Sequence, residues 1–219
     1  LEERMRKLLT EKEDFQNYLE ILKQSPVRSL RCNTLKISPE ELKSRLEKKG
    51  WTIKQPWPKN PEVMIVEGKF ASEEDISKKT SDNDNQDVKN INMLNDNHNK
   101  KSVTLKPKKI TANEVSSNLI DLEPGELGRA LEHMLGYYYI QELASMLPII
   151  ALEPKPGELI LDLCASPGSK TTQTSACMQN TGTIIANEVS LSRIKILAAN
   201  LERCGCTNTI ITRKEGAAL

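Results

Sequence analysis

The sequence lacks the features that mark membrane and secreted proteins. It contains no uninterrupted apolar run of about 18 residues, which a membrane-spanning helix would need. The first residues, LEERMRKLLTEKEDF, are strongly charged and include no apolar signal-peptide core. We therefore expect an intracellular protein without membrane contact, located in the cytoplasm or in the nucleus and nucleolus.

Metal-binding patterns are also missing. The 219 residues include two histidines and five cysteines, and the cysteines are scattered. Cys204 and Cys206 have the wrong spacing for a zinc knuckle, and no histidine lies near them. His98 stands in a polar run, and no residue near His133 has the spacing of a catalytic partner. The sequence predicts no metal site and no disulfide framework, and it leaves the oligomeric state open.

The N-terminal part, residues 1–71, is predicted to be a small α+β module. Apolar residues repeat at helical spacing up to about residue 24, and RSLRCNTLKI alternates like a strand. A helix is predicted to begin after Ser38, which can cap it, and to end at Gly50. Lys and Arg clearly outnumber Asp and Glu from Lys23 to Lys59, an excess typical of nucleic-acid binders or of a merely solvated basic face.

The middle of the chain, residues 72–118, has a different composition. The run SDNDNQDVKNINMLNDNHNKK is rich in Asn, Asp and Lys and almost free of large apolar side chains. Such a segment cannot bury enough apolar surface to offset the entropy that ordering it would cost. We predict a disordered insertion in a surface loop.

Residues 119–219 are predicted to open an α/β domain. YIQELASMLPIIAL is expected to be a helix, and ELILDLC is a near-continuous apolar run, typical of a parallel strand covered on both faces. A helix, the strand GTIIANE, the helix LSRIKILAANLERC and the strand NTIIT follow. This β-α-β-α-β order is typical of the first half of a doubly wound, Rossmann-like parallel sheet.

The turn in LDLCASPGSKTTQ is the strongest candidate for a ligand site. Gly168 lets backbone approach a ligand closely, and the following helix offers free amides to an anion. Glu188 ends the next strand, where its carboxylate could accept hydrogen bonds from two ribose hydroxyls. Glu215 follows the third strand and is similarly placed to accept a hydrogen bond from the amine of adenine. The glycine spacing of a P-loop or a dinucleotide site is missing, so S-adenosylmethionine or an ordinary strand-to-helix turn remains.

Several blocks in order resemble the RNA (cytosine-5)-methyltransferases of the RsmB/RsmF/NSUN (Sun) family, and among them most the RsmF-like branch. The blocks include RCNTLKISPEEL, YYIQELASMLP, CASPGSKTTQ and GTIIANEVSLSRIKILAANLERCG. The resemblance implies an α/β fold, the N-terminal part of a doubly wound Rossmann-like methyltransferase sheet. It also implies a cofactor, S-adenosylmethionine, and an RNA substrate, either ribosomal or transfer RNA. The cofactor-binding residues that it implies are Cys164, Ala165, Ser166, Pro167, Gly168, Ser169, Lys170, Glu188 and, more loosely, Glu215.

The resemblance also implies two catalytic cysteines that this sequence does not contain. In the family a thiolate attacks carbon 6 of cytosine, and a second cysteine assists release, in motifs resembling DAPCSG and TCS. The chain reaches KEGAAL without either motif, so we expect the catalytic cysteines to lie beyond Leu219. We therefore expect an N-terminal portion of an enzyme that does not methylate by itself. The RNA-binding candidates are Arg28, Arg31 and Lys36. The alternatives are a non-catalytic RNA-binding protein with a degenerate methyltransferase half, and a generic nucleotide-binding protein.

Overall fold

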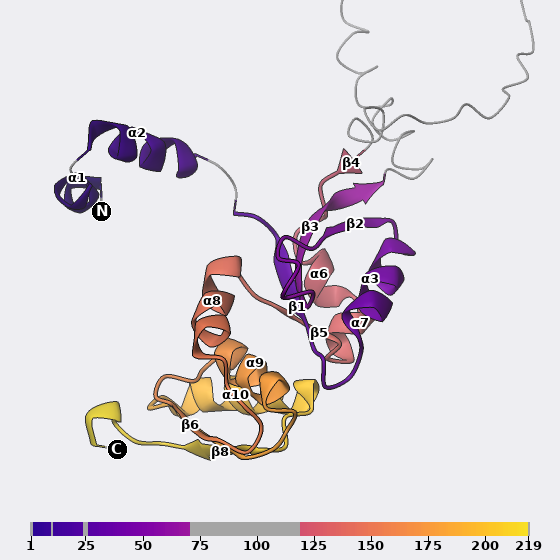
Figure 1. Cartoon of the computed structure of the whole chain (residues 1–219), viewed down its shortest axis with the longest axis vertical. Coiled ribbons are helices and arrows are strands. Elements are labelled where there is room, and N and C mark those ends of the chain that lie inside the picture. The colour runs from indigo at the N-terminus through magenta and orange to yellow at the C-terminus, as the bar shows by residue number, and fades with distance from the viewer. Residues whose placement is uncertain (1, 10, 24–25, 71–118, 219) are drawn as a thin grey trace, which may run out of the picture.

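The computed structural model describes residues 2–9, 11–23, 26–70 and 119–218 (Figure 1). The predicted polar insertion at 72–118 lies outside the described residues. Leu219 lies outside them as well, so the expectation that catalytic cysteines follow it stays a prediction.

Two short helices, α1 (Glu2–Leu8) and α2 (Lys12–Ile21), lie in the stretch predicted as one helical segment up to about residue 24, and two separate sheets follow. None of the described helices has the length and apolar character that crossing a membrane requires.

The first sheet is antiparallel, and its strands come from both sides of the insertion. Its strand order is β2-β3-β1-β5, and β4 pairs with β3. The strands are β1 (Ser29–Cys32), β2 (Trp51–Lys54), β3 (Val63–Phe70), β4 (Leu119–Ile120) and β5 (Tyr138–Ile140). Helices α3 (Pro39–Glu47), α6 (Glu126–Arg129) and α7 (Leu131–Met134) accompany this sheet. A core that includes Leu30, Leu42 and Met64, all fully buried, joins α3 to the strands.

Helix α3 begins where the sequence predicts. The Ser38 hydroxyl accepts the backbone N–H of Glu41 at 3.1 Å, which satisfies one of the free amides of the first turn. Gly50 then adopts a φ of +85°, a conformation in which glycine carries no steric cost, and the chain turns into β2. The predicted helix boundaries are therefore confirmed.

The two ends of the segment 71–118 meet in the first sheet. Phe70 pairs with Leu119 and Lys69 with Ile120 in an antiparallel register. The approach is close, because a Cβ at Gly68 would lie 2.8 Å from the carbonyl oxygen of Ile120. The segment thus leaves and rejoins the fold at neighbouring points of one hairpin.

Residues 119–140 complete the first sheet, although the sequence places them at the start of the methyltransferase part. Strand β5 pairs with β1, with Tyr139 opposite Arg31. YIQELASMLPIIAL is not one helix, since it divides into β5 and helix α8 (Leu143–Leu152). The junction between the two sheets therefore falls after residue 140.

The second sheet is parallel, as predicted. Its order is β6-β7-β8, formed by Leu159–Asp162, Thr183–Asn187 and Thr209–Thr212. Helices α9 (Ser169–Cys177) and α10 (Leu191–Cys204) make the two crossovers, and η2 (Gly216–Ala218) lies near the end of the chain. This is a Rossmann-like β-α-β-α-β unit, which confirms the predicted fold class.

Among the described residues, helices cover only one face of this sheet. Ala186 on β7 packs against Leu197 and Leu201 of α10, and in Figure 1 the helices α9 and α10 lie above strands β6 and β8. On the opposite face Leu161, Ile185 and Ile210 form one row across the strands. Leu161 and Ile210 are 49% and 57% exposed, so the predicted cover on both faces of β6 is not found in this part of the chain.

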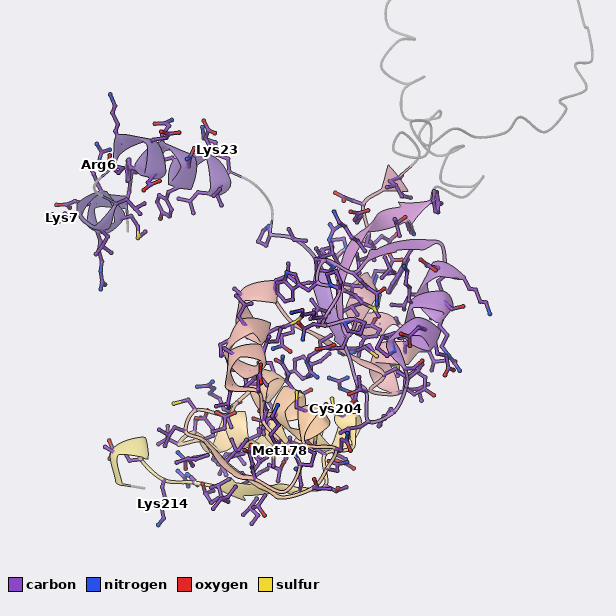
Figure 2. The ribbon with its side chains drawn as sticks, viewed as in Figure 1. Arg6, Lys7, Lys23, Met178, Cys204 and Lys214 are labelled. Carbon is purple, nitrogen blue, oxygen red and sulfur yellow. The ribbon has the colours of Figure 1, made fainter. Side chains whose placement is uncertain are left out.

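Side chains of the RCNTLK stretch join the first sheet to α10. The Asn33 amide donates to the carbonyl oxygens of Gly136 and Cys204 at 2.8 and 2.7 Å. The Lys36 ammonium donates to the carbonyl oxygen of Arg203 at 2.7 Å, at the C-terminal end of α10, where a cation is favoured. Figure 2 shows Cys204 near this junction.

Candidate cofactor site

The turn between β6 and α9 has the conformation that its single glycine predicts. Gly168 has a φ of +104° and precedes the first residue of α9. Its N–H donates to the carbonyl oxygen of Ala165 at 2.7 Å, which closes the turn. A Cβ at this position would lie 3.1 Å from Cδ1 of Leu197, so both the backbone angle and the packing favour glycine.

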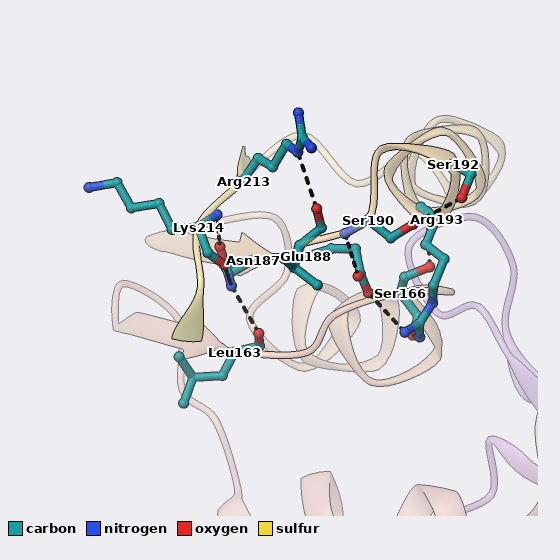
Figure 3. Close-up of polar contacts among 10 residues, drawn as sticks. Leu163, Ser166, Asn187, Glu188, Ser190, Ser192, Arg193, Arg213 and Lys214 are labelled. Carbon is teal, nitrogen blue, oxygen red and sulfur yellow. Dashed lines mark hydrogen bonds and ion pairs between the residues drawn. The ribbon is translucent and has the colours of Figure 1, made fainter. Parts of the chain in front are cut away.

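The predicted acid, Glu188, lies beside this turn. Its carboxylate is 3% exposed and accepts the backbone N–H of Ser190 at 2.9 Å. Arg193 forms an ion pair with Glu188 at 3.3 Å and also donates to the carbonyl oxygen of Ser166 at 2.7 Å. The Ser166 hydroxyl donates to the carbonyl oxygen of Arg193 at 2.9 Å. The structure therefore brings the turn and the acid into one cluster, drawn in Figure 3.

Asn187 holds the carboxyl ends of the three parallel strands together, and nothing in the sequence singled it out. Its amide nitrogen donates to the carbonyl oxygens of Leu163 and Lys214 at 3.1 and 2.9 Å. Its amide oxygen accepts the N–H of Lys214 at 2.9 Å (Figure 3). The same oxygen accepts the hydroxyl of Thr212 at 3.1 Å. All four bonds depend on the parallel register, which a position after a strand does not reveal.

The other predicted cofactor residues take varied positions around the turn. Cys164 is exposed, whereas Ala165 is 4% exposed and belongs to the core under α10. The Lys170 ammonium donates to the hydroxyl of Ser145 on α8 at 3.0 Å. Glu215 is exposed beyond β8, and no hydrogen bond within the described ranges connects it to the turn. Glu215 therefore remains a prediction without structural support at this site.

The three predicted RNA-binding residues do not share one open surface. Arg28 is partly exposed and pairs with Asp121 at 3.0 Å. Lys36 is exposed, but its ammonium is held by the carbonyl oxygens of Leu135 and Arg203. Arg31 is 2% exposed, so the prediction that it lies on the RNA-facing surface is wrong.

Four of the five cysteines are poorly suited to nucleophilic chemistry. Burial raises the pKa of Cys32 to about 12 and that of Cys206 to about 11. Burial also raises the pKa of Cys204 and, although part of its surface is exposed, that of Cys177. The thiolate is the reactive form, so these four side chains resemble packing residues rather than nucleophiles. Within the described part of the chain, no group of three His, Cys, Asp or Glu side chains could hold a metal ion.

The chain is similar to proteins that are named as ribosomal RNA methyltransferases. Residues 149–219 match the family model described as 16S rRNA methyltransferase RsmB/F. Across 98% of its length the chain is 34% identical to ribosomal RNA small subunit methyltransferase F of Erwinia tasmaniensis. Across 86% of its length it is 35% identical to the protein of the same name from Photobacterium profundum. The chain spans 34% and 29% of these relatives, about a third of their length.

Solved structures share the fold over both sheets. A methyltransferase homolog protein from Pyrococcus horikoshii superposes with a TM-score of 0.57 at 30% identity, covering 89% of this chain and 46% of that one. NSun6 from the same organism, solved with SFG, superposes with a TM-score of 0.66, covering 98% of this chain and 64% of that one. Its identity is 23%, so it bears on the fold alone. The match to the family model and the similarity to the curated relatives confirm the resemblance to the RsmB/RsmF/NSUN family and to its RsmF-like branch.

Proposed function

We propose that this chain, an RsmF-like member of the RsmB/RsmF/NSUN methyltransferase family, forms the S-adenosylmethionine-binding part of an RNA (cytosine-5)-methyltransferase. The observation that carries the proposal is the cluster in which Arg193 joins Glu188 to the Ser166 carbonyl. In parallel α/β sheets the ligand lies at the carboxyl ends of the strands, where this cluster stands. The names of the curated relatives favour small-subunit ribosomal RNA as the substrate.

The residues at the turn suit this cofactor. The Glu188 carboxylate has acceptor sites beyond the two that Ser190 and Arg193 occupy, and these sites can take two ribose hydroxyls. The first amides of α9 have no partner within the helix and can hold a carboxylate, which the positive end of the helix dipole also favours. Gly168 keeps the approach to these amides free of a side chain. When bound, S-adenosylmethionine supplies an electrophilic methyl group.

In this proposal the nucleophilic thiolate comes from outside the 219 residues, in the part of the parent enzyme expected beyond Leu219. The four cysteines whose pKa is raised form little thiolate near neutral pH. Cys164 lies in the turn itself, where its exposed side chain would contact the cofactor rather than the cytosine. The 219 residues alone are therefore expected to bind cofactor without transferring its methyl group.

The test uses the full-length protein that contains this chain. Calorimetry should detect binding of S-adenosylhomocysteine, and nucleoside mass spectrometry should detect 5-methylcytosine in small-subunit ribosomal RNA after incubation with S-adenosylmethionine. Glu188→Gln should weaken cofactor binding by about tenfold or more, because hydrogen bonds to a charged acceptor are stronger than those to an amide. Glu202→Gln, at an exposed position on α10, is the matched control and should change nothing.

Two results would contradict the proposal in different ways. Absence of S-adenosylhomocysteine binding to the full-length protein would remove the cofactor site. RNA binding with no methyl transfer to any RNA would favour the alternative function, a non-catalytic RNA-binding protein.

A further inference from the structure

Two side chains of the first sheet, which lie opposite each other on neighbouring strands, contact the cofactor turn. We propose that Arg31 on β1 and Tyr139 on β5 are positioning residues, which orient the backbone of the turn for cofactor binding. Their Cα atoms are paired in the antiparallel register of β1 and β5. The inference rests on the proposed cofactor site and adds to it a dependence on the other sheet.

Arg31 holds the start of α9. Its Nε donates to Oε1 of Gln141 at 2.9 Å, and its Nη2 donates to the hydroxyl of Thr172 at 2.8 Å. The same Nη2 lies 3.4 Å from the carbonyl oxygen of Ser169, and the Thr172 hydroxyl donates to that oxygen at 3.1 Å. The first residue of α9 is thus tied to a side chain that lies 138 residues earlier in the sequence.

Tyr139 binds Pro167, the residue that precedes Gly168. Its hydroxyl donates to the carbonyl oxygen of Pro167 at 3.3 Å. The amide of Asn200 on α10 donates to the same oxygen at 2.8 Å and to the Tyr139 hydroxyl at 3.3 Å. The residues before and after Gly168 are Pro167 and Ser169, and the carbonyl oxygen of each therefore contacts a side chain of the first sheet.

These contacts fix the amides that a ligand would use. The peptide between Ser169 and Lys170 is planar and trans, so its carbonyl oxygen and its N–H point in opposite directions. When the Ser169 oxygen is held toward Arg31, the N–H of Lys170 is directed to the other side of the same peptide. The first-turn amides then keep one orientation before the cofactor arrives, which lowers the entropy that binding must overcome.

The charge of Arg31 gives a second reason to connect it with the turn. Within the described ranges no carboxylate lies within 4.0 Å of its guanidinium, and its partners there are neutral oxygens. Burying a cation without a counter-charge is costly, and the desolvation lowers the pKa of Arg31. Its positive charge lies at the N-terminal end of α9, where the helix dipole is also positive. Both charges favour an anionic group of a ligand at this turn.

The experiment measures S-adenosylhomocysteine binding by calorimetry with the full-length protein and three variants. Tyr139→Phe removes one hydroxyl and should weaken binding about threefold to tenfold, the range of one hydrogen bond. Arg31→Met removes the charge and its hydrogen bonds and should weaken binding by about tenfold or more. Tyr138→Phe is the matched control on the same strand. It loses a buried hydrogen bond of 2.6 Å to the Leu127 carbonyl but no contact with the turn, so its affinity should stay within about twofold of wild type.

The binding isotherm separates positioning from a merely structural role. A variant that only misfolds more often lowers the number of binding sites and leaves the dissociation constant of the folded fraction unchanged. A positioning role raises the dissociation constant while the stoichiometry stays near one. If Arg31→Met yields no folded protein, the dissociation constant of Tyr139→Phe alone tests the positioning role. Wild-type affinity in Tyr139→Phe would overturn the inference, whereas wild-type protein that binds no S-adenosylhomocysteine would overturn the proposed function instead.

Discussion

At the scale of single residues, the candidate site is built mainly from backbone groups that side chains hold in place. Gly168 supplies a left-handed turn, Asn187 joins three strand ends, and Arg193 links the acid to the turn. Among these residues, only Glu188 is expected to form hydrogen bonds to the cofactor through its side chain, and Cys164 is expected to lie against the cofactor. Small changes of backbone geometry should therefore affect cofactor affinity as strongly as the loss of a polar group.

We expect Gly168→Ala to weaken cofactor binding severely. The new Cβ would lie 3.1 Å from Leu197, and a φ of +104° disfavours any residue with a side chain by roughly 1–2 kcal/mol. Gly157→Ala is the control, because Gly157 has a φ of +88° but open space around its Cβ. Both variants should lose stability in thermal unfolding, and only Gly168→Ala should lose affinity in calorimetry. Equal affinity in the two variants would contradict the placement of the cofactor.

We also expect the thiols to react with N-ethylmaleimide in a defined order at about pH 8. Cys164 is exposed, whereas burial raises the pKa of Cys32 to about 12 and that of Cys206 to about 11, so little thiolate forms there. Mass spectrometry of peptides after short exposure should find Cys164 modified well before Cys32 and Cys206. S-adenosylhomocysteine should protect Cys164, and a rate unaffected by this ligand would argue that the cofactor lies elsewhere.

At the scale of elements, local patterns predicted most helices and strands, and long-range pairing decided the rest. The Ser38 cap and Gly50 delimit α3, and Gly205 ends α10 with a φ of +73°. Strand β5 could not be recognised, because its three residues join a partner more than 100 positions away. The prediction that Arg31 lies on the RNA-facing surface was wrong for the same reason. A charged residue in a basic stretch predicts exposure, and its neutral partners Gln141 and Thr172 are remote in sequence.

The pairing of β3 with β4 predicts that the segment between these strands can be shortened without loss of stability. Replacing residues 72–117 with a Gly/Ser loop of about six residues should leave both sheets intact, because the flanking residues Phe70 and Leu119 are already paired. Each halving of a loop lowers the cost of closing it by about 0.6 kcal/mol, so shortening the loop between Phe70 and Leu119 about sixfold should stabilise the fold by roughly 1.6 kcal/mol. Chemical denaturation of the shortened and natural proteins measures the difference. A marked loss of stability would show that the segment packs on the fold.

At the scale of the whole molecule, the two sheets differ in how completely their apolar residues are covered. The first sheet has its own core, which includes Leu30, Leu42 and Met64. The second has helices on one face, and the row Leu161, Ile185 and Ile210 on the other face has no cover from the described residues. An apolar row of this kind beside open strand edges promotes association with other chains.

We therefore expect the 219-residue chain, when it is produced alone, to self-associate through this face. Replacing Leu161 with Glu and Ile210 with Lys should lower the average molar mass measured by light scattering, because charges on an apolar face oppose its burial. Leu131→Lys is the control, since Leu131 is 59% exposed and lies on α7, which belongs to the part of the chain that forms the first sheet. A similar decrease in the control would mean that general surface charge, and not this face, sets the association.

The hairpin that brackets residues 71–118 also divides the first sheet between two stretches of chain. A cut within that segment would leave one polypeptide with β1, β2 and β3 and another with β4, β5 and the parallel sheet. Two strand pairings, β1 with β5 and β3 with β4, would still connect them. We therefore expect the two pieces to complement each other, and reassembly of a split reporter fused to the cut ends would measure how readily they associate.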